Sequence, residues 1–184
     1  MNVGEELAAA YLEHIKGCEF VQKNLYTPDV QGEIDVVGID LNTKTVYICE
    51  VVVHLVTGMM YVNLRNSQTN NVSKLMDKFS KDIEYANKYF SDYRKVFMLW
   101  SPIVKAAVRT TNKNPSQIDD VNEVKKQLYE KYGVELQLVI NEQFYQCLHE
   151  MREYARSETK EIKNPIMRML QVEEYLKKYL KKES

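Results

Sequence analysis

The sequence predicts an α/β fold, in which helices flank a mixed central sheet and the chain ends in a helical extension. Short apolar runs with a period of two recur along the chain, and between them lie longer stretches whose apolar residues are three and four positions apart. Strands that alternate with amphipathic helices are typical of a sheet covered on its faces. At 184 residues, the chain is expected to form a single domain over 1–184.

The first half of the chain predicts a helix, three strands and a second helix. The first helix has an amphipathic pattern and ends at Gly17, a residue type that readily takes the backbone conformation of a helix end. A proline turn at 27–29 and a polar loop at 63–71 separate the later elements. The expected elements are a helix from Gly4, a strand over 18–25, a strand from Gly32, a strand over 46–54 and a helix over 72–90.

The second half predicts two further strands and three helices. Asp119 or Asp120 can cap the helix after the loop at 112–116, and Gly133 closes that helix. Pro165 breaks the helical pattern of the C-terminal region into two segments. The expected elements are strands over 93–100 and 134–140, and helices over 121–132, about 142–160 and 165–182.

Glu50 is the only acid in the strand expected over 46–54. The period of two places Glu50 on the face that carries Val46, Ile48, Val52 and His54. A carboxylate buried among β-branched residues is costly unless it is paired, protonated or bound to a metal. Two interpretations follow: Glu50 has a functional role, or it pairs with a lysine or sits where the strand emerges into solvent.

Asp35, in the run Gly32-Glu33-Ile34-Asp35, is expected beside Glu50 across a hairpin. Two neighbouring carboxylates supply the oxygen ligands that Mg²⁺ requires. This hairpin, with the helix and strand before it, resembles the PD-(D/E)xK nuclease superfamily, and its pattern is most similar to the small Holliday-junction-resolvase-like branch. The family signature has an Asp on the second strand and Glu-x-Lys on the third, but Val52 stands at the lysine position.

The resemblance implies a restriction-endonuclease-like core of helix, three-stranded meander, helix and strand. This nuclease-like core would occupy about 1–100, and the sheet extension and covering helices about 101–184. The implied function is a metal-dependent endonuclease that hydrolyses phosphodiester bonds in DNA. Its Mg²⁺ or Mn²⁺ would be held by Asp35, Glu50, the backbone carbonyl of Val51 and, from the first helix, Glu6, for which a solvated position is the alternative.

Val52 leaves the family's catalytic lysine without a counterpart on the strand. Some family members carry this lysine on the second helix, where Lys74 is the candidate. The helical wheel instead groups Lys74, Lys78 and Lys81 away from the apolar stripe, which favours a solvated charged face. His54 is the other candidate, either as a contact to DNA or to a bound water, or as a polar strand end. Val52 also favours an alternative function, a catalytically degenerate module that binds nucleic acid or another subunit.

Charge and composition limit the classes of partner. The formal net charge is -1, so contact with DNA would depend on local basic patches. Phosphate and base contacts are expected from the polar loop at 63–71 and nearby lysines. Residues 151–184 carry nine basic against six acidic residues, which either are solvated or contact DNA. The apolar stripe of the last helix also fits a homodimer through the C-terminal helices. A scaffold without a nucleic-acid role is a third interpretation.

The remaining patterns point to a reduced, cytoplasmic protein without a membrane role. The three cysteines lack metal-ligand spacing, and two of them fall in apolar strand patterns. A continuous run of about 18 apolar residues does not occur in the sequence. Phosphate-binding glycine loops, paired-cysteine zinc patterns and Ser/His/Asp arrangements are also absent from the sequence.

Overall fold

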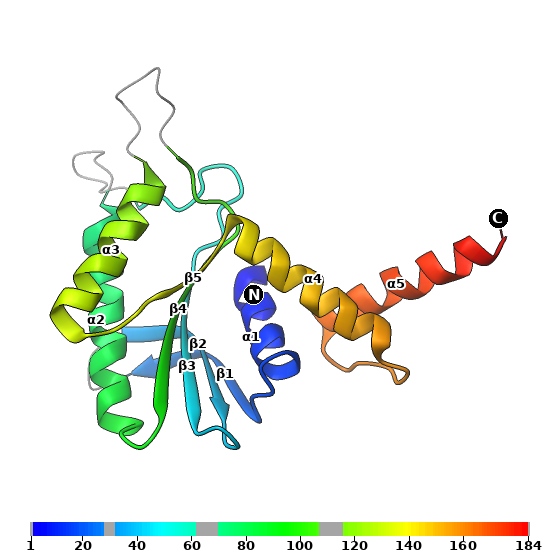
Figure 1. Cartoon of the computed structure of the whole chain (residues 1–184), viewed down its shortest axis with the longest axis horizontal. Helices are drawn as coiled ribbons and strands as arrows, with labels where there is room; N and C mark the ends of the chain where they lie inside the picture. The colour runs from blue at the N-terminus through cyan, green and yellow to red at the C-terminus, as the bar shows by residue number, and fades with distance from the viewer. Residues whose placement is uncertain (1, 28–31, 62–69, 107–115, 184) are drawn as a thin grey trace.

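The chain folds into a mixed sheet with helices on both faces, as the computed structural model shows for residues 2–27, 32–61, 70–106 and 116–183 (Figure 1). These residues contain five strands and five helices, which confirms the predicted α/β class. The strands are β1 (Phe20–Thr27), β2 (Gly32–Asp40), β3 (Thr45–Val51), β4 (Arg94–Ser101) and β5 (Gln137–Ile140). The helices are α1 (Val3–His14), α2 (Asn71–Tyr89), α3 (Gln117–Tyr132), α4 (Asn141–Ser157) and α5 (Pro165–Glu183).

The strands lie in the sheet in chain order, β1-β2-β3-β4-β5. The first three form an antiparallel meander, whereas β4 runs parallel to β3 and β5 parallel to β4. Parallel neighbours need a crossover connection, and α2 and α3 provide the two crossovers. The strand β3 is therefore central, with β2 on one side up to Cys49 and β4 on the other.

The two faces of the sheet are covered by different pairs of helices. In Figure 1, α2 and α3 cover one face, and α1 and α4 cover the other. Alternate residues of β3 divide between these layers as predicted: Val46 and Ile48 pack toward α2 and α3, while Tyr47, Cys49 and Val51 pack toward α1 and α4. All three cysteines of the chain are buried and free.

Several element boundaries differ from the sequence prediction, among them β1, which spans Phe20–Thr27 in place of 18–25, and one end each of β3, α3 and β5. The strand β3 ends at Val51, and a turn follows in which the Gly58 amide donates to the carbonyl of His54. The helix α3 begins at Gln117, because the Ser116 side chain caps it by accepting from the Asp119 amide at 3.2 Å, in place of an aspartate cap. The strand β5 is shorter than 134–140. The turn at 27–29 and the loops at 63–71 and 112–116 lie largely outside the described residues.

The helix α5 carries apolar residues on two sides. Met167 and Leu170 are buried, whereas Met169, Val172 and Leu176 are exposed. Figure 1 shows this helix extending away from the sheet beside α4. The predicted homodimer through the C-terminal helices stays a prediction. Across the described ranges, each helix is too short or too polar to cross a membrane.

Candidate active site

Asp35 lies where the hydrogen-bonded ladder between β2 and β3 stops. The last paired residues are Val36 and Cys49, so the same register would place Asp35 opposite Glu50. The Asp35 Oδ2 instead accepts a hydrogen bond from the backbone amide of Val51 at 2.7 Å. The hairpin thus brings the carboxyl of Asp35 to the end of β3, as the sequence predicts.

The strand β1 is also irregular where it passes Asp35. Asn24 has a φ of 51°, in the left-handed region that Asn tolerates better than most residues. Val21 and Leu25 are four positions apart and would share one face of a regular strand, but Val21 packs toward α1 and Leu25 packs toward α2. The register places Asn24 opposite Asp35, although the pair is missing from the ladder. Both strands are therefore distorted at the level of Asp35.

Glu50 is fully buried on the face of β3 that α2 covers. Its Oε2 contacts the ammonium of Lys78, which extends from α2. The same ammonium lies 3.6 Å from the Oδ2 of Asp35. Lys78 therefore joins the two carboxylates that the sequence analysis singled out.

Asp82 is a further buried acid at this site. It lies one helical turn after Lys78 and is only 3% exposed. Its charge acts on Glu50 and raises the pKa of that carboxyl. The oxygens Glu50 Oε1 and Asp82 Oδ2 are buried and lack a hydrogen-bond partner among the described residues. Buried polar atoms without partners are rare in folded proteins, so this pair requires an explanation.

The ionisation of these groups is strongly perturbed. Burial raises the pKa of Glu50 well above its usual value, and the charges of Asp82 and Asp35 add to the shift while Lys78 opposes it. Burial raises the pKa of Asp82 to about 7, against the effects of Glu50 and Lys78. Burial alone would lower the pKa of Lys78, but the charges of Glu50 and Asp35 outweigh it and the net shift is upward. Perturbed groups of this kind cluster at functional sites.

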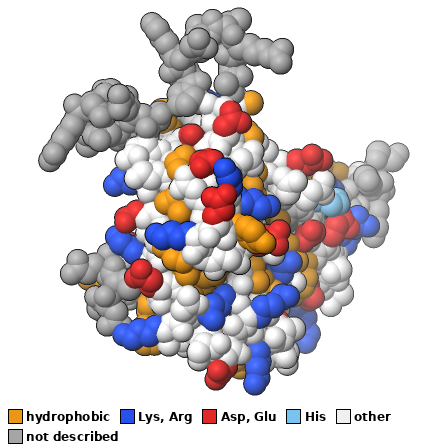
Figure 2. Space-filling model, turned by 60° about the vertical axis from the view of Figure 1, so that its left-hand side comes forward, with side chains coloured by type: hydrophobic (Ala, Val, Ile, Leu, Met, Phe, Trp, Pro, Cys, Tyr) orange, Lys and Arg blue, Asp and Glu red, His pale blue; other side chains and the backbone are white. Residues whose placement is uncertain are grey.

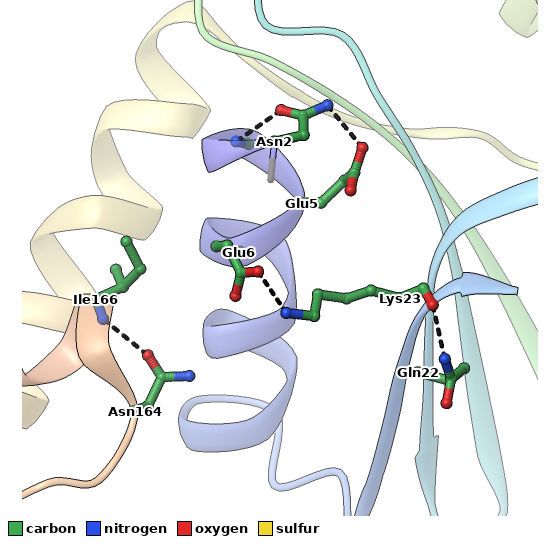
Figure 3. A network of polar contacts seen from close by, with 8 residues as sticks. Asn2, Glu5, Glu6, Gln22, Lys23, Asn164 and Ile166 are labelled. Carbon is green, nitrogen blue, oxygen red and sulfur yellow. Dashed lines mark hydrogen bonds and ion pairs between the residues drawn. The ribbon is translucent and has the colours of Figure 1, made fainter.

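The other predicted site residues lie apart from this cluster. Glu6 forms an ion pair with Lys23, which joins α1 to β1 (Figure 3). His54 is exposed and follows the end of β3, so it does not share the strand face of Glu50. Lys74 is exposed near the start of α2. Of the predicted residues, the structure thus brings together Asp35, Glu50 and the backbone of Val51.

The prediction of a solvated lysine face on α2 holds for Lys74 and is wrong for Lys78. Lys78 precedes Phe79, a fully buried residue of the apolar stripe, so the stem of its side chain starts close to the sheet. A long aliphatic stem can then carry the ammonium to a buried acid. Sequence reasoning also missed Asp82, although a signal was present. Asp82 falls between Phe79 and Ala86 at the spacing of the buried stripe, where an acid is unexpected.

The donor atoms of this site suit a hard divalent cation. Asp35 and Glu50 offer carboxylate oxygens, Val51 offers a backbone carbonyl, and one buried oxygen of Glu50 has no hydrogen-bond partner in the part of the chain that the structure describes. Within the described ranges, groups of three or more His, Cys, Asp or Glu side chains arranged to hold a metal do not occur. Mg²⁺ is usually bound by one or two carboxylates and keeps several waters, so two acids are consistent with this ion.

The surface near the site has mixed charge. Figure 2 turns forward the side where α2 and α3 lie in Figure 1, and basic and acidic side chains are interspersed over its described part. Contact with a polyanion would therefore rely on local patches, in keeping with the net charge of -1. Comparisons of the chain with protein-family models, with curated proteins and with solved structures found no match.

Proposed function

We propose that this chain is a metal-dependent nuclease that hydrolyses phosphodiester bonds in DNA. The observation that carries the proposal is the contact of Lys78, from α2, with Glu50 and its approach to Asp35. An Asp, a Glu and a Lys thus meet in space although position 52 is a valine. The order of α1, the antiparallel meander, α2 and the parallel β4 also supports a restriction-endonuclease-like core.

Each residue has a distinct role under this proposal. Asp35, Glu50 and the carbonyl of Val51 would hold Mg²⁺ or Mn²⁺, which when bound polarises the phosphodiester and lowers the pKa of an attacking water. Lys78 keeps its proton, because the charges of Glu50 and Asp35 raise its pKa. It therefore donates hydrogen bonds to a phosphate oxygen or to the attacking water and does not act as a base.

The polynucleotide would approach along α2, where Lys74 is exposed and close to the site in sequence. His54, exposed after β3, is a further candidate contact. The loop at 63–71, proposed to contact phosphates and bases, lies mostly outside the described residues. Contacts of this kind position the substrate and would weaken as salt rises.

Cleavage of labelled linear, branched and single-stranded DNA with Mg²⁺ or Mn²⁺ tests the proposal. Wild type is expected to cut, and Asp35→Asn is expected to be inactive. Lys78→Met should slow cleavage by about 100-fold or more, as does removal of one transition-state donor in other enzymes. Lys74→Met is the matched control, since it removes an exposed lysine one turn earlier on the same helix, and it should change the rate only a few-fold. Equal loss in both lysine variants would count against Lys78.

The ion pair between Lys78 and Glu50 also favours a second, noncatalytic function. The ion pair with Lys78 already compensates the charge of Glu50, as a structural role of this acid would require. On this alternative, the chain is a catalytically degenerate module that binds nucleic acid or another subunit. DNA binding without cleavage, in a folded wild-type protein supplied with metal, would select it.

A further inference from the structure

The ammonium of Lys78 lies beside the two carboxylates that are proposed to bind the cation. It contacts the Oε2 of Glu50 and lies 3.6 Å from the Oδ2 of Asp35. A divalent cation bound to the same two acids would repel an ammonium at this distance. Lys78 and the cation therefore compete for these oxygens.

Asp82 offers the ammonium a second carboxylate. It follows Lys78 by four positions on α2, and side chains at this spacing are neighbours on a helix. Its Oδ2 is buried and has no hydrogen-bond partner within the described ranges. The charge of Lys78 already acts on Asp82. Lys78 thus lies between the two predicted metal ligands and an acid of its own helix.

We propose that Lys78 is a built-in occupant of the cation site and that Asp82 receives its ammonium when a divalent cation binds. This inference rests on the proposed function. Asp82 is then a positioning residue, because it holds Lys78 beside the site after Lys78 has left Glu50 and Asp35. The exchange would also explain why two acids, each with an oxygen that lacks a partner among the described residues, are buried next to one lysine.

The test is a calorimetric titration of the full chain with Mn²⁺ at pH 8, without nucleic acid. Lys78→Gln should bind Mn²⁺ about tenfold more tightly than wild type, because no ammonium has to be displaced. Asp82→Asn should bind it several-fold more weakly, because the displaced ammonium loses its acceptor. In the double variant Lys78→Gln/Asp82→Asn, the effect of Asp82→Asn should disappear. Lys74→Gln is the control and should match wild type.

Each contrary result overturns a different part. Equal affinity of wild type and Lys78→Gln would overturn the competition. A loss in the double variant as large as in Asp82→Asn alone would make Asp82 a ligand and overturn its role as acceptor. Absence of Mn²⁺ binding in every variant would overturn the proposed function itself, and the inference with it.

The folding of each variant is checked by circular dichroism before titration. If Lys78→Gln does not fold, Lys78→Arg provides the same test with the opposite sign. A guanidinium forms paired hydrogen bonds to carboxylates and is harder to displace than an ammonium. Lys78→Arg should therefore bind Mn²⁺ several-fold more weakly than wild type, and an unchanged affinity would overturn the competition.

Discussion

The two faces of β3 come from alternate residues of one strand, yet they bury different chemistry. Toward α1 and α4, the strand packs Tyr47, Cys49 and Val51 into an apolar cluster that includes Trp100. Toward α2, the same strand buries Glu50 beside Lys78 and Asp82. Both faces contribute apolar burial, since Val46 and Ile48 pack into a second apolar cluster on the α2 side, but only that side adds charged groups whose burial is costly. The buried charged groups are thus confined to one side of a single layer of backbone.

The largest expected effect is on the apolar face. Trp100 is 1% exposed, and its ring packs edge-on against Tyr11 and Phe144, with centroids 5.2 and 5.8 Å away. Trp100→Ala should lower the free energy of unfolding by about 3–5 kcal/mol, the usual cost of removing a large buried ring. Urea unfolding measures this, and Tyr145→Ala on the exposed side of α4 is the control, with little expected change.

The same variant tests the separation of the two faces. Under the proposed function, Mn²⁺ stabilises wild type by mass action, and the folded fraction of Trp100→Ala should gain the same increment. A folded Trp100→Ala protein that no longer responds to Mn²⁺ would show that the apolar face shapes the site.

The second effect is a pH dependence that belongs to the charged face. In the folded chain the pKa of Asp82 is about 7, above its ordinary value of 3.8. Between these values the folded protein holds a proton that the unfolded chain releases, so the contribution of Asp82 to stability is largest below pH 4 and is lost as pH rises toward 7. Each unit of pKa difference corresponds to about 1.4 kcal/mol, which puts the total at a few kcal/mol.

Urea unfolding in EDTA between pH 4.5 and 8 measures this contribution as the difference between wild type and Asp82→Asn. The variant should lose less stability than wild type as pH rises, although Glu50, whose pKa is also raised, leaves part of the slope. Parallel pH profiles for the two proteins would show that Asp82 is not protonated in the folded state.

The sequence predicted the division of β3 because a period of two fixes which residues share a face. It also singled out Glu50, since one acid in an apolar strand stands out against its neighbours. Lys78 was not predictable in the same way. Its contact depends on how α2 lies across the sheet, which no local pattern determines. Asp82 could have been predicted by the same reasoning as Glu50, because it is an acid in the apolar stripe of a helix. The hydrogen bond from the Val51 amide to Asp35 could not, because it depends on where the ladder between β2 and β3 stops.

A third, smaller effect links the two faces through Val51. Gly4, in the first turn of α1, lies against this strand end, and a Cβ added there would lie 2.1 Å from the Cγ2 of Val53 and 2.8 Å from the Cγ1 of Val51. Gly4→Ala should cost about 1–3 kcal/mol by overpacking, measured by urea unfolding. Because the Val51 amide donates to Asp35, the variant should also bind Mn²⁺ more weakly, unlike Trp100→Ala.

Relief of the overpacking is the control for this prediction. Val53→Ala removes the closest contact, so Gly4→Ala/Val53→Ala should destabilise less than the two single changes add up to. Strict additivity would place the cause of the loss elsewhere than at this contact.

The smallest effect concerns Glu6, which the family resemblance made a candidate metal ligand and which the structure pairs with Lys23 (Figure 3). Both side chains are partly exposed, so Glu6→Gln should lower the stability by less than about 1 kcal/mol. If Glu6 serves only this ion pair, calorimetry should give the same Mn²⁺ affinity for Glu6→Gln, Lys23→Gln and wild type. A tenfold loss in Glu6→Gln alone would make Glu6 a ligand, and the charged site would then extend around the end of β3 onto the α1 face.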